Sequence, residues 1–257
     1  MQNRIDNLVK WIRTQVPEGG KAVLGISGGK DSTIAAALCV KALGKENVVG
    51  VMMPNGYQRD IDDSKRVCEH LGIFSLNVNI EEAYMGILDS MSHALAIRHI
   101  PYPYNTTHSN DMIKTNLPAR LRMSTLYAVA ALYPNSRVVN TCNYSEDYVG
   151  YSTKYGDAAG DFSPLGNLTV REVLEIGDDL GLPKCLVHKV PSDGMCGKSD
   201  EDNLGFTYEE LDDYLLNGVN CKTDWETIKK IEKLHKETRH KYKPMPMFNP
   251  KEERIII

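Results

Sequence analysis

Residues 22 to 33 read Ala22-Val-Leu-Gly-Ile-Ser-Gly-Gly-Lys-Asp-Ser-Thr33, and this stretch decides the fold. Its apolar beginning, Ala22 to Ile26, has the length and character of a fully buried strand. A helix is predicted over residues 31–43, and Gly44 closes it. The glycines between strand and helix allow a tight turn that directs N–H groups toward oxygen ligands, and the helix N-terminus adds roughly half a positive charge. The turn therefore predicts an anion-binding site.

The alternation of strand and helix continues along the chain. Apolar strands separated by helical stretches imply an α/β fold, a Rossmann-like parallel sheet with helices on both faces. Such a sheet binds its ligands at the carboxyl ends of the strands. We expect a single domain over residues 1–257. Helices are predicted over residues 4–16, 60–71, 116–132, 169–180, 208–216 and 222–238, and further strands over residues 48–53, 73–78 and 137–141.

Two segments show no periodic pattern. Residues 99–116 are rich in Pro, Tyr, Asn, Thr and His, which predicts an irregular excursion over the surface. Residues 191–205 are too polar and too rich in glycine to form part of the core. The second segment is either a linker or a lid, and a lid is favoured because ordered structure is predicted on both sides.

Composition excludes several classes of function. The net charge of −4 and the pI of about 6.0 offer no broad basic surface for nucleic acid. The six cysteines contain no Cys-x-x-Cys pair, which argues against a zinc site. The sequence shows neither a signal peptide nor an apolar run approaching the ~20 residues of a membrane span, so we expect a cytoplasmic protein without a membrane partner.

The glycine turn differs from the two commonest phosphate loops, the Walker A motif and the dinucleotide fingerprint. Asp31, at the opening of the helix, is either a plain helix cap or a ligand that holds Mg²⁺ against phosphate oxygens. Following an apolar strand, the run from Ser27 to Ser32 resembles the pyrophosphate loop of the ATP-pyrophosphatase (adenine nucleotide alpha hydrolase) superfamily. Its members cleave ATP between the α and β phosphates and transfer AMP. The resemblance implies that ATP is bound by Gly25, Ile26, Ser27, Gly28, Gly29, Lys30, Asp31 and Ser32.

The second half of the chain resembles one branch of this superfamily, the ammonia-dependent NAD synthetases. Asn116-Leu-Pro-Ala-Arg120-Leu-Arg122 is similar to a segment that opens a substrate-binding helix there. Thr141 to Glu146 and Lys154-Tyr-Gly-Asp157-Ala-Ala-Gly-Asp161 resemble the signature of the family. Segments that resemble the lid and post-lid segments of the family follow in the same order. A late basic pair, His240-Lys241, comes after them. The similarity runs from about residue 4 to residue 248.

The resemblance implies a role for each matching position. Asp31 and Glu146 would be the Mg²⁺ carboxylates, and Thr141 and Ser192 would contact ATP. Asp157, together with Asp31, would be catalytic, because a buried carboxylate must hold ammonium and accept its proton. The substrate deamido-NAD would be bound by Arg120, Tyr127, Lys154, Asp161, His240 and Lys241. For Tyr127, core packing is an equal alternative.

The chain departs from the family pattern in ways that keep alternatives open. Val170 stands where the family usually has a lysine that contacts ATP phosphates, and Arg171 or Lys189 could supply the missing charge. A nucleotide-binding regulator without turnover is therefore a rival hypothesis, as is another ligase of the superfamily, such as a tRNA-thiolating enzyme. No glutaminase domain fits in this length, which predicts free ammonia, or a separate glutaminase, as the nitrogen source. The family implies a homodimer, with which the helix over residues 4–16 is compatible.

Overall fold

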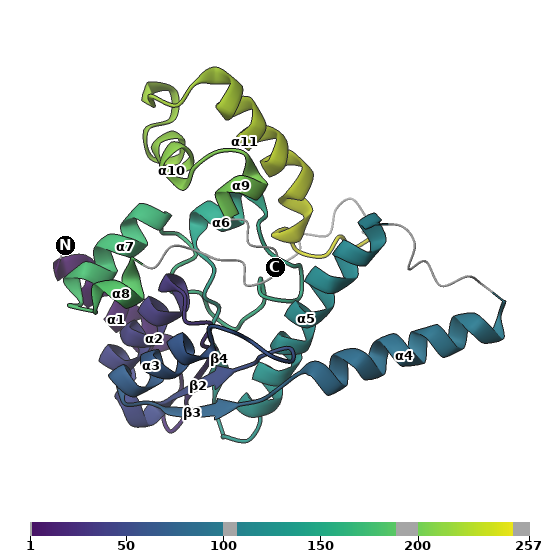
Figure 1. Cartoon of the computed structure of the whole chain (residues 1–257). Helices are drawn as coiled ribbons and strands as arrows, with labels where there is room; N and C mark the ends of the chain where they lie inside the picture. The colour runs from purple at the N-terminus through teal and green to yellow at the C-terminus, as the bar shows by residue number, and fades with distance from the viewer. Residues whose placement is uncertain (1, 100–106, 189–199, 249–257) are drawn as a thin grey trace.

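A parallel β-sheet forms the centre of the protein (Figure 1), as the sequence predicts. The computed structural model describes residues 2–99, 107–188 and 200–248. The sheet has the order β3-β2-β1-β4, and all of its neighbouring strands run parallel. Its strands are β1 (Ala22–Gly25), β2 (Val48–Met52), β3 (Phe74–Asn77) and β4 (Arg137–Val138). The strand predicted over residues 137–141 is thus shorter than expected, with one isolated bridge from Val139 to Phe162 beyond it.

Helices cover both faces of the sheet, which confirms the predicted fold class. Alternate residues of β1 face opposite sides, so Ala22 and Leu24 join one hydrophobic cluster and Val23 joins another. On the first face, buried residues of α2 fill the space between sheet and outer helices. The helices of this face are α1 (Gln2–Gln15), α2 (Lys30–Leu43), α3 (Ile61–Leu71), α7 (Val170–Asp179) and α8 (Lys184–Val187).

The second face is covered by α5 (Thr107–Ala130), whose Val129 and Ala130 pack against β1 and β2. A further helix, α4 (Glu81–Ile97), contacts α5 and projects away from the body of the protein in Figure 1. The apolar face of α1 packs on α2, with Ile5 and Ile12 almost wholly buried. The predicted helix at the start of the chain is therefore confirmed, and its apolar face is buried against a helix of the same chain.

Residues between Tyr148 and Leu234 form a separate hydrophobic cluster above the carboxyl edge of the sheet (Figure 1). Val170 of α7, Leu211 of α10 and Ile231 of α11 are buried in this cluster. Its helices are α6 (Tyr144–Val149), α9 (Asp200–Leu204), α10 (Tyr208–Asn217) and α11 (Trp225–Thr238). Short 3₁₀ turns, η1 (Lys45–Asn47), η2 (Gly218–Asn220) and η3 (Arg239–Lys241), complete the described elements.

The prediction of an irregular excursion over residues 99–116 is wrong for its second half. Helix α5 begins at Thr107, nine residues before the predicted start at Asn116. Pro118, which is typical of the first turn of a helix, lies in the interior of α5 instead. The turns of α5 after Pro118 pack against the sheet through Leu121, Leu126, Val129 and Ala130, and the helix extends back from them to Thr107 despite the local signals from proline and asparagine. Residues 100–106 lie outside the described part of the chain.

Within residues 2–99, 107–188 and 200–248, no helix combines the length and the apolar character needed to cross a bilayer.

One close contact fixes the distance between α7 and α2. A Cβ atom placed on Gly177 of α7 would lie 2.9 Å from Ile34 Cδ1 and 2.8 Å from Val187 Cγ1. Both of these neighbours are wholly buried, so they have little room to move away.

We predict that Gly177→Ala destabilises the protein. Overpacking of the core costs about 1–3 kcal/mol, and the better helix propensity of alanine returns about 1 kcal/mol. The free energy of unfolding in urea should therefore fall by about 1 kcal/mol. The matched control is Asp179→Ala. Asp179 is exposed on the same helix, so this variant should unfold at the same urea concentration as the wild type or at a slightly higher one. A Gly177→Ala protein more stable than the wild type would contradict the packing argument.

Candidate active site

The turn after β1 is held in shape by its own serine and threonine side chains. Ser32 Oγ lies 3.1 Å from Ser27 Oγ and accepts a hydrogen bond of 3.3 Å from the Ser27 backbone N–H. Thr33 Oγ1 donates to the Gly29 carbonyl at 2.8 Å. Gly29 occupies the N-cap position of α2 and has no side chain that could cap the helix. The first N–H groups of α2 are therefore presented to an anion.

Gly28 lets a second helix approach this turn. Its φ of +79° lies in the left-handed region, which favours glycine. A Cβ atom on Gly28 would lie 2.9 Å from both Asp63 Cβ and the Ser64 backbone nitrogen. The first turn of α3 thus packs directly on the phosphate loop, a contact that the sequence does not predict. No local signal reveals it, because residues 28 and 63 become neighbours only through the sheet.

Two carboxylates lie beside the loop, as the resemblance implied. Lys30 Nζ lies 2.7 Å from Asp31 Oδ2 and 4.0 Å from Glu146 Oε1. Burial raises the pKa of Glu146 well above its usual range, and the negative charge of Asp31 adds to this shift. Burial alone would lower the pKa of Lys30, but the charges of Asp31 and Glu146 outweigh it and raise that pKa. The lysine is therefore a permanent cation between two acids.

Asn143, for which the sequence predicts no role, connects the two carboxylates. Its side chain is wholly buried. Its Nδ2 donates to Asp31 Oδ1 at 3.1 Å, while its Oδ1 accepts from the Glu146 backbone N–H at 3.0 Å. Asn143 thus caps α6, and the Glu146 side chain completes the capping box. Asp31 itself bonds to side chains rather than capping α2.

The donor set agrees with a magnesium ion that shares its ligands with a nucleotide. Within the described ranges, no group of three or more His, Cys, Asp or Glu side chains could hold a metal alone. Mg²⁺ commonly takes one or two protein carboxylates and completes its shell with substrate phosphates and water. Asp31 and Glu146 offer two such hard oxygen donors next to the anion-binding turn.

Asp157 lies in the loop that follows α6. Its Oδ1 accepts a hydrogen bond of 2.8 Å from the Thr153 N–H, and its carbonyl accepts one of 2.8 Å from Asn140 Nδ2. Desolvation raises the pKa of Asp157, and the charge of Lys241 opposes this shift. A carboxylate with a raised pKa is a better proton acceptor. Asp157 is exposed in the structure, so the prediction of a buried carboxylate is wrong, and a role in proton transfer depends on its raised pKa.

The predicted basic residues come together from three distant segments. Arg120 Nε, on α5, donates to the Lys154 carbonyl at 3.3 Å. Lys154 Nζ in turn donates to the His240 carbonyl at 2.9 Å. Lys241 Nζ donates to the carbonyls of Gly150 and Ser152, at 2.6 Å and 2.7 Å. These contacts bring the predicted basic residues together, and the charge of Lys241 acts on Asp157.

Tyr127 and Asp161 contact each other. Tyr127 Oη donates to Asp161 Oδ1 at 3.2 Å, while Asp161 Oδ2 accepts a hydrogen bond of 2.7 Å from the Val138 N–H at the end of β4. Tyr127 is partly exposed, which argues against simple core packing. Thr141 follows β4 at the same carboxyl edge of the sheet, beside the end of β1. Ser192 and Lys189 lie outside the described residues.

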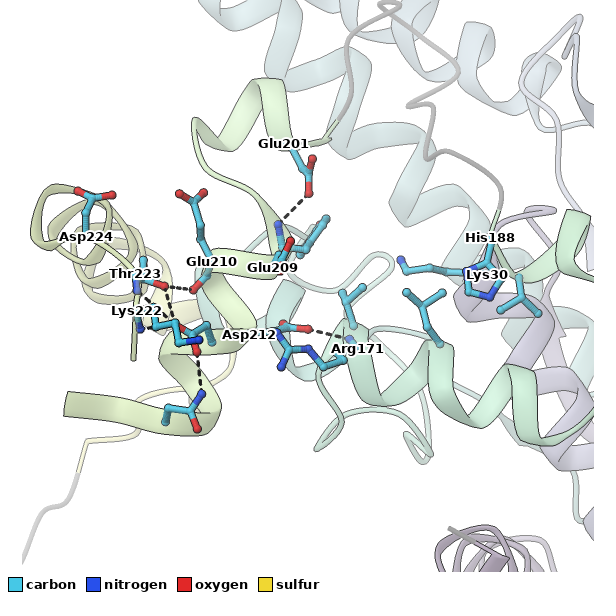
Figure 2. A pocket seen from close by; sticks show the side chains of 16 residues that line it. Lys30, Arg171, His188, Glu201, Glu209, Glu210, Asp212, Lys222, Thr223 and Asp224 are labelled. Atoms are coloured by element: carbon cyan, nitrogen blue, oxygen red, sulfur yellow. Dashed lines mark hydrogen bonds between the residues drawn. The ribbon is translucent and has the colours of Figure 1, made fainter. Parts of the chain in front are cut away.

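A cavity of about 1090 Å³ extends from the phosphate loop toward α10 (Figure 2). Lys30, Val170, Arg171 and Tyr208 are among the residues that line it. Val170 is buried in the cluster above the sheet, so this position contributes packing rather than charge. In Figure 2 the Arg171 side chain lies beside Asp212, whose Oδ2 accepts a hydrogen bond from the Arg171 N–H at 2.7 Å. Arg171 therefore brings a positive charge to the same cavity as Lys30.

The lysines of α11 behave differently from the late basic pair. Lys229 pairs with Glu226 at 2.9 Å, and its Nζ lies 5.6 Å from the centroid of the exposed Trp225 ring. Lys230 and Lys233 are exposed. This stretch is a solvated helix face, and only its end, at His240 and Lys241, reaches the site.

The chain is similar to known proteins over most of its length. The family model described as NAD synthase matches residues 4–245. The NH(3)-dependent NAD(+) synthetase of Alkaliphilus metalliredigens is 39% identical over 96% of this chain and 98% of the relative. That of Methanocaldococcus jannaschii is 39% identical over 93% of this chain and 86% of the relative.

Solved structures show the same similarity. The structure of NMN synthetase from Francisella tularensis superposes with a TM-score of 0.82 at 34% identity, covering 96% of this chain and 98% of that one. The NH3-dependent NAD synthetase of Campylobacter jejuni gives a TM-score of 0.73 at 28% identity, with the same coverage. With its phosphate loop, its paired carboxylates and a family match over nearly its whole length, this chain belongs to the NAD synthase family.

Proposed function

We propose that this protein is an ammonia-dependent NAD synthetase, a ligase that uses ATP to amidate deamido-NAD and releases AMP and pyrophosphate. The observation that carries the proposal is the phosphate loop at the end of β1, with the carboxylates of Asp31 and Glu146 beside it. Residues 1–257 would act as one catalytic domain, because the site draws on positions from Ser27 to Lys241.

In the first step, an oxygen of the nicotinate carboxylate attacks the α-phosphate of ATP. The bond between the α- and β-phosphates breaks, and pyrophosphate leaves. The N–H groups at the start of α2 and the Lys30 ammonium stabilise the negative charge of the leaving group. Arg120, Lys154 and Lys241 would bind the anionic groups of the dinucleotide.

Asp31 and Glu146 would hold Mg²⁺, with Asn143 fixing the position of both carboxylates. When bound, the metal supplies positive charge that offsets the charge developing on the phosphates.

In the second step, ammonia attacks the adenylated carboxyl carbon, the C–N bond forms, AMP leaves with the electrons of the broken C–O bond, and the attacking nitrogen loses one proton to solvent to give the amide. Ammonium has no free electron pair, so a base must remove a proton before the attack. Asp157 is suited to this role because desolvation raises its pKa. The positive charges of Lys241 and Arg122 both interact with this carboxylate.

The mononucleotide is a second candidate substrate. The solved structure with a TM-score of 0.82 is that of a protein named NMN synthetase. Nicotinate mononucleotide carries the same carboxylate as deamido-NAD, so the same two steps would convert it to the amide. The ratio of kcat/KM for the two acids, measured with ammonia and ATP, decides between them.

We also propose a homodimer that forms through α4. This helix projects from the body (Figure 1), yet many of its exposed side chains are apolar. Met85 is 55% exposed and Ile97 is 78% exposed, and Ile87 and Met91 are open to solvent as well. An exposed apolar helix on a projecting arm favours burial against an identical helix of a second copy.

Asp31→Ala should abolish ligase activity. We expect the release of AMP and pyrophosphate, dependent on deamido-NAD and ammonia, to fall by at least about 100-fold, because the loss of one proposed Mg²⁺ ligand removes positive charge that would offset the charge on the phosphates. The matched control is Asp62→Ala on α3, an exposed carboxylate that pairs with Lys65 at 2.8 Å and should keep full activity. Turnover that survives in Asp31→Ala would remove the metal assignment. Products consisting of ADP and orthophosphate would overturn the proposed reaction, and binding without turnover in the wild type would favour the regulator.

Asp157→Asn should separate the two steps. The asparagine keeps the shape of the side chain but cannot accept a proton, so amide formation should fall by about 100-fold or more. The exchange of labelled pyrophosphate into ATP, dependent on deamido-NAD, should persist because it reports the first step alone. Equal losses in both assays would assign Asp157 to substrate binding instead.

The double variant Ile87→Glu with Met91→Glu should be monomeric by light scattering, because charge is placed in the middle of the proposed apolar interface. Met247→Glu, at another exposed apolar position outside α4, should remain dimeric. A monomeric wild-type protein would overturn the proposal of a homodimer.

A further inference from the structure

Tyr208, the first residue of α10, has a buried hydroxyl that the proposed mechanism does not use. Its side chain is only 6% exposed, and its ring packs in the cluster with Phe206, Leu211 and Val170. Its Oη has no hydrogen-bond partner among the residues that the structure describes. Burying a hydroxyl without a partner costs free energy, so native proteins usually satisfy such a group.

The surroundings of the hydroxyl belong to the phosphate site. Lys30 Nζ lies 5.7 Å from the centroid of the Tyr208 ring, and both residues line the same cavity. Desolvation raises the pKa of Tyr208, and the negative charges of Glu146, Asp200 and Asp31 raise it further. The hydroxyl therefore keeps its proton at neutral pH and can act as a hydrogen-bond donor.

The nearby carboxylates are already engaged by other groups. Asp31 bonds to Lys30 and Asn143, and Glu146 completes the capping box of α6. Asp200 accepts a hydrogen bond of 3.1 Å from Tyr151 Oη. Glu201 accepts one of 2.8 Å from the backbone N–H of Tyr208 itself. The Tyr208 hydroxyl is a donor whose neighbouring carboxylates already accept hydrogen bonds, and its ring lies beside Lys30 of the phosphate loop. It is therefore suited to donate to an oxygen of a bound ligand.

We propose that Tyr208 is a further catalytic residue, whose hydroxyl donates a hydrogen bond to an oxygen of the pyrophosphate part of ATP. The inference rests on the proposed function, because it requires the triphosphate to lie on the turn after β1. The contact stabilises the leaving pyrophosphate, in addition to the N-terminus of α2 and Lys30. It also connects α10 to the phosphate loop through the ligand.

The test compares two tyrosines of the same helix. Tyr208→Phe removes the unpaired hydroxyl and keeps the ring, so the melting temperature should stay the same or rise. The affinity for inorganic pyrophosphate, measured by calorimetry with Mg²⁺, should fall about 10- to 100-fold, as expected for one lost hydrogen bond to a charged group. The rate of deamido-NAD-dependent ATP–pyrophosphate exchange should fall as well.

Tyr214→Phe is the matched control. Tyr214 Oη donates to Glu232 at 2.8 Å, and neither residue lines the cavity, so its loss should lower the melting temperature and leave pyrophosphate binding unchanged. Wild-type affinity in Tyr208→Phe would overturn the inference and leave the proposed function standing. A drop in melting temperature like that of Tyr214→Phe would show that the hydroxyl has a protein partner, and would overturn it too. A wild-type protein that binds neither pyrophosphate nor ATP would overturn both proposals.

Discussion

The two carboxylates of the site are positioned by one buried amide, the side chain of Asn143. Its oxygen caps α6 and so sets the direction of Glu146, and its nitrogen holds Asp31 at the start of α2. Because Asn143 is wholly buried, both hydrogen bonds act in surroundings of low dielectric, where they are strong and their loss is costly. The distance between the phosphate loop and α6 is thereby fixed before any ligand binds.

Much of the fold could be predicted from local pattern. The apolar runs that became β1 and β2 are buried on both faces, and Gly44 and Gly72 end helices where the sequence indicated. The pattern failed at α4 and at the start of α5. Apolar residues of α4 are distributed around the helix and many are exposed, so they form no single stripe for a periodicity argument to find.

The candidate site, like the fold, was predicted only in part from the sequence. Arg120, Lys154 and His240 were predicted through resemblance, and the structure brings them into one hydrogen-bonded series. Their individual roles stay predictions, as does that of Ser192. Asn143 and Tyr208 received no role from the sequence, although both lie in segments that resemble the family. Their importance depends on burial and on partners more than sixty residues away, which a linear motif does not encode.

Val170 places an apolar, packed side chain at the edge of the cavity beside Lys30. Its side chain joins α7 to Phe206 and Leu211 in the cluster above the sheet. Apolar contacts are barely screened by dissolved ions, whereas exposed ion pairs such as Lys229–Glu226 weaken as the Debye length shrinks. The attachment of α7 to α10 therefore keeps its strength in concentrated salt, and this wall of the cavity is insensitive to the ionic composition of its surroundings.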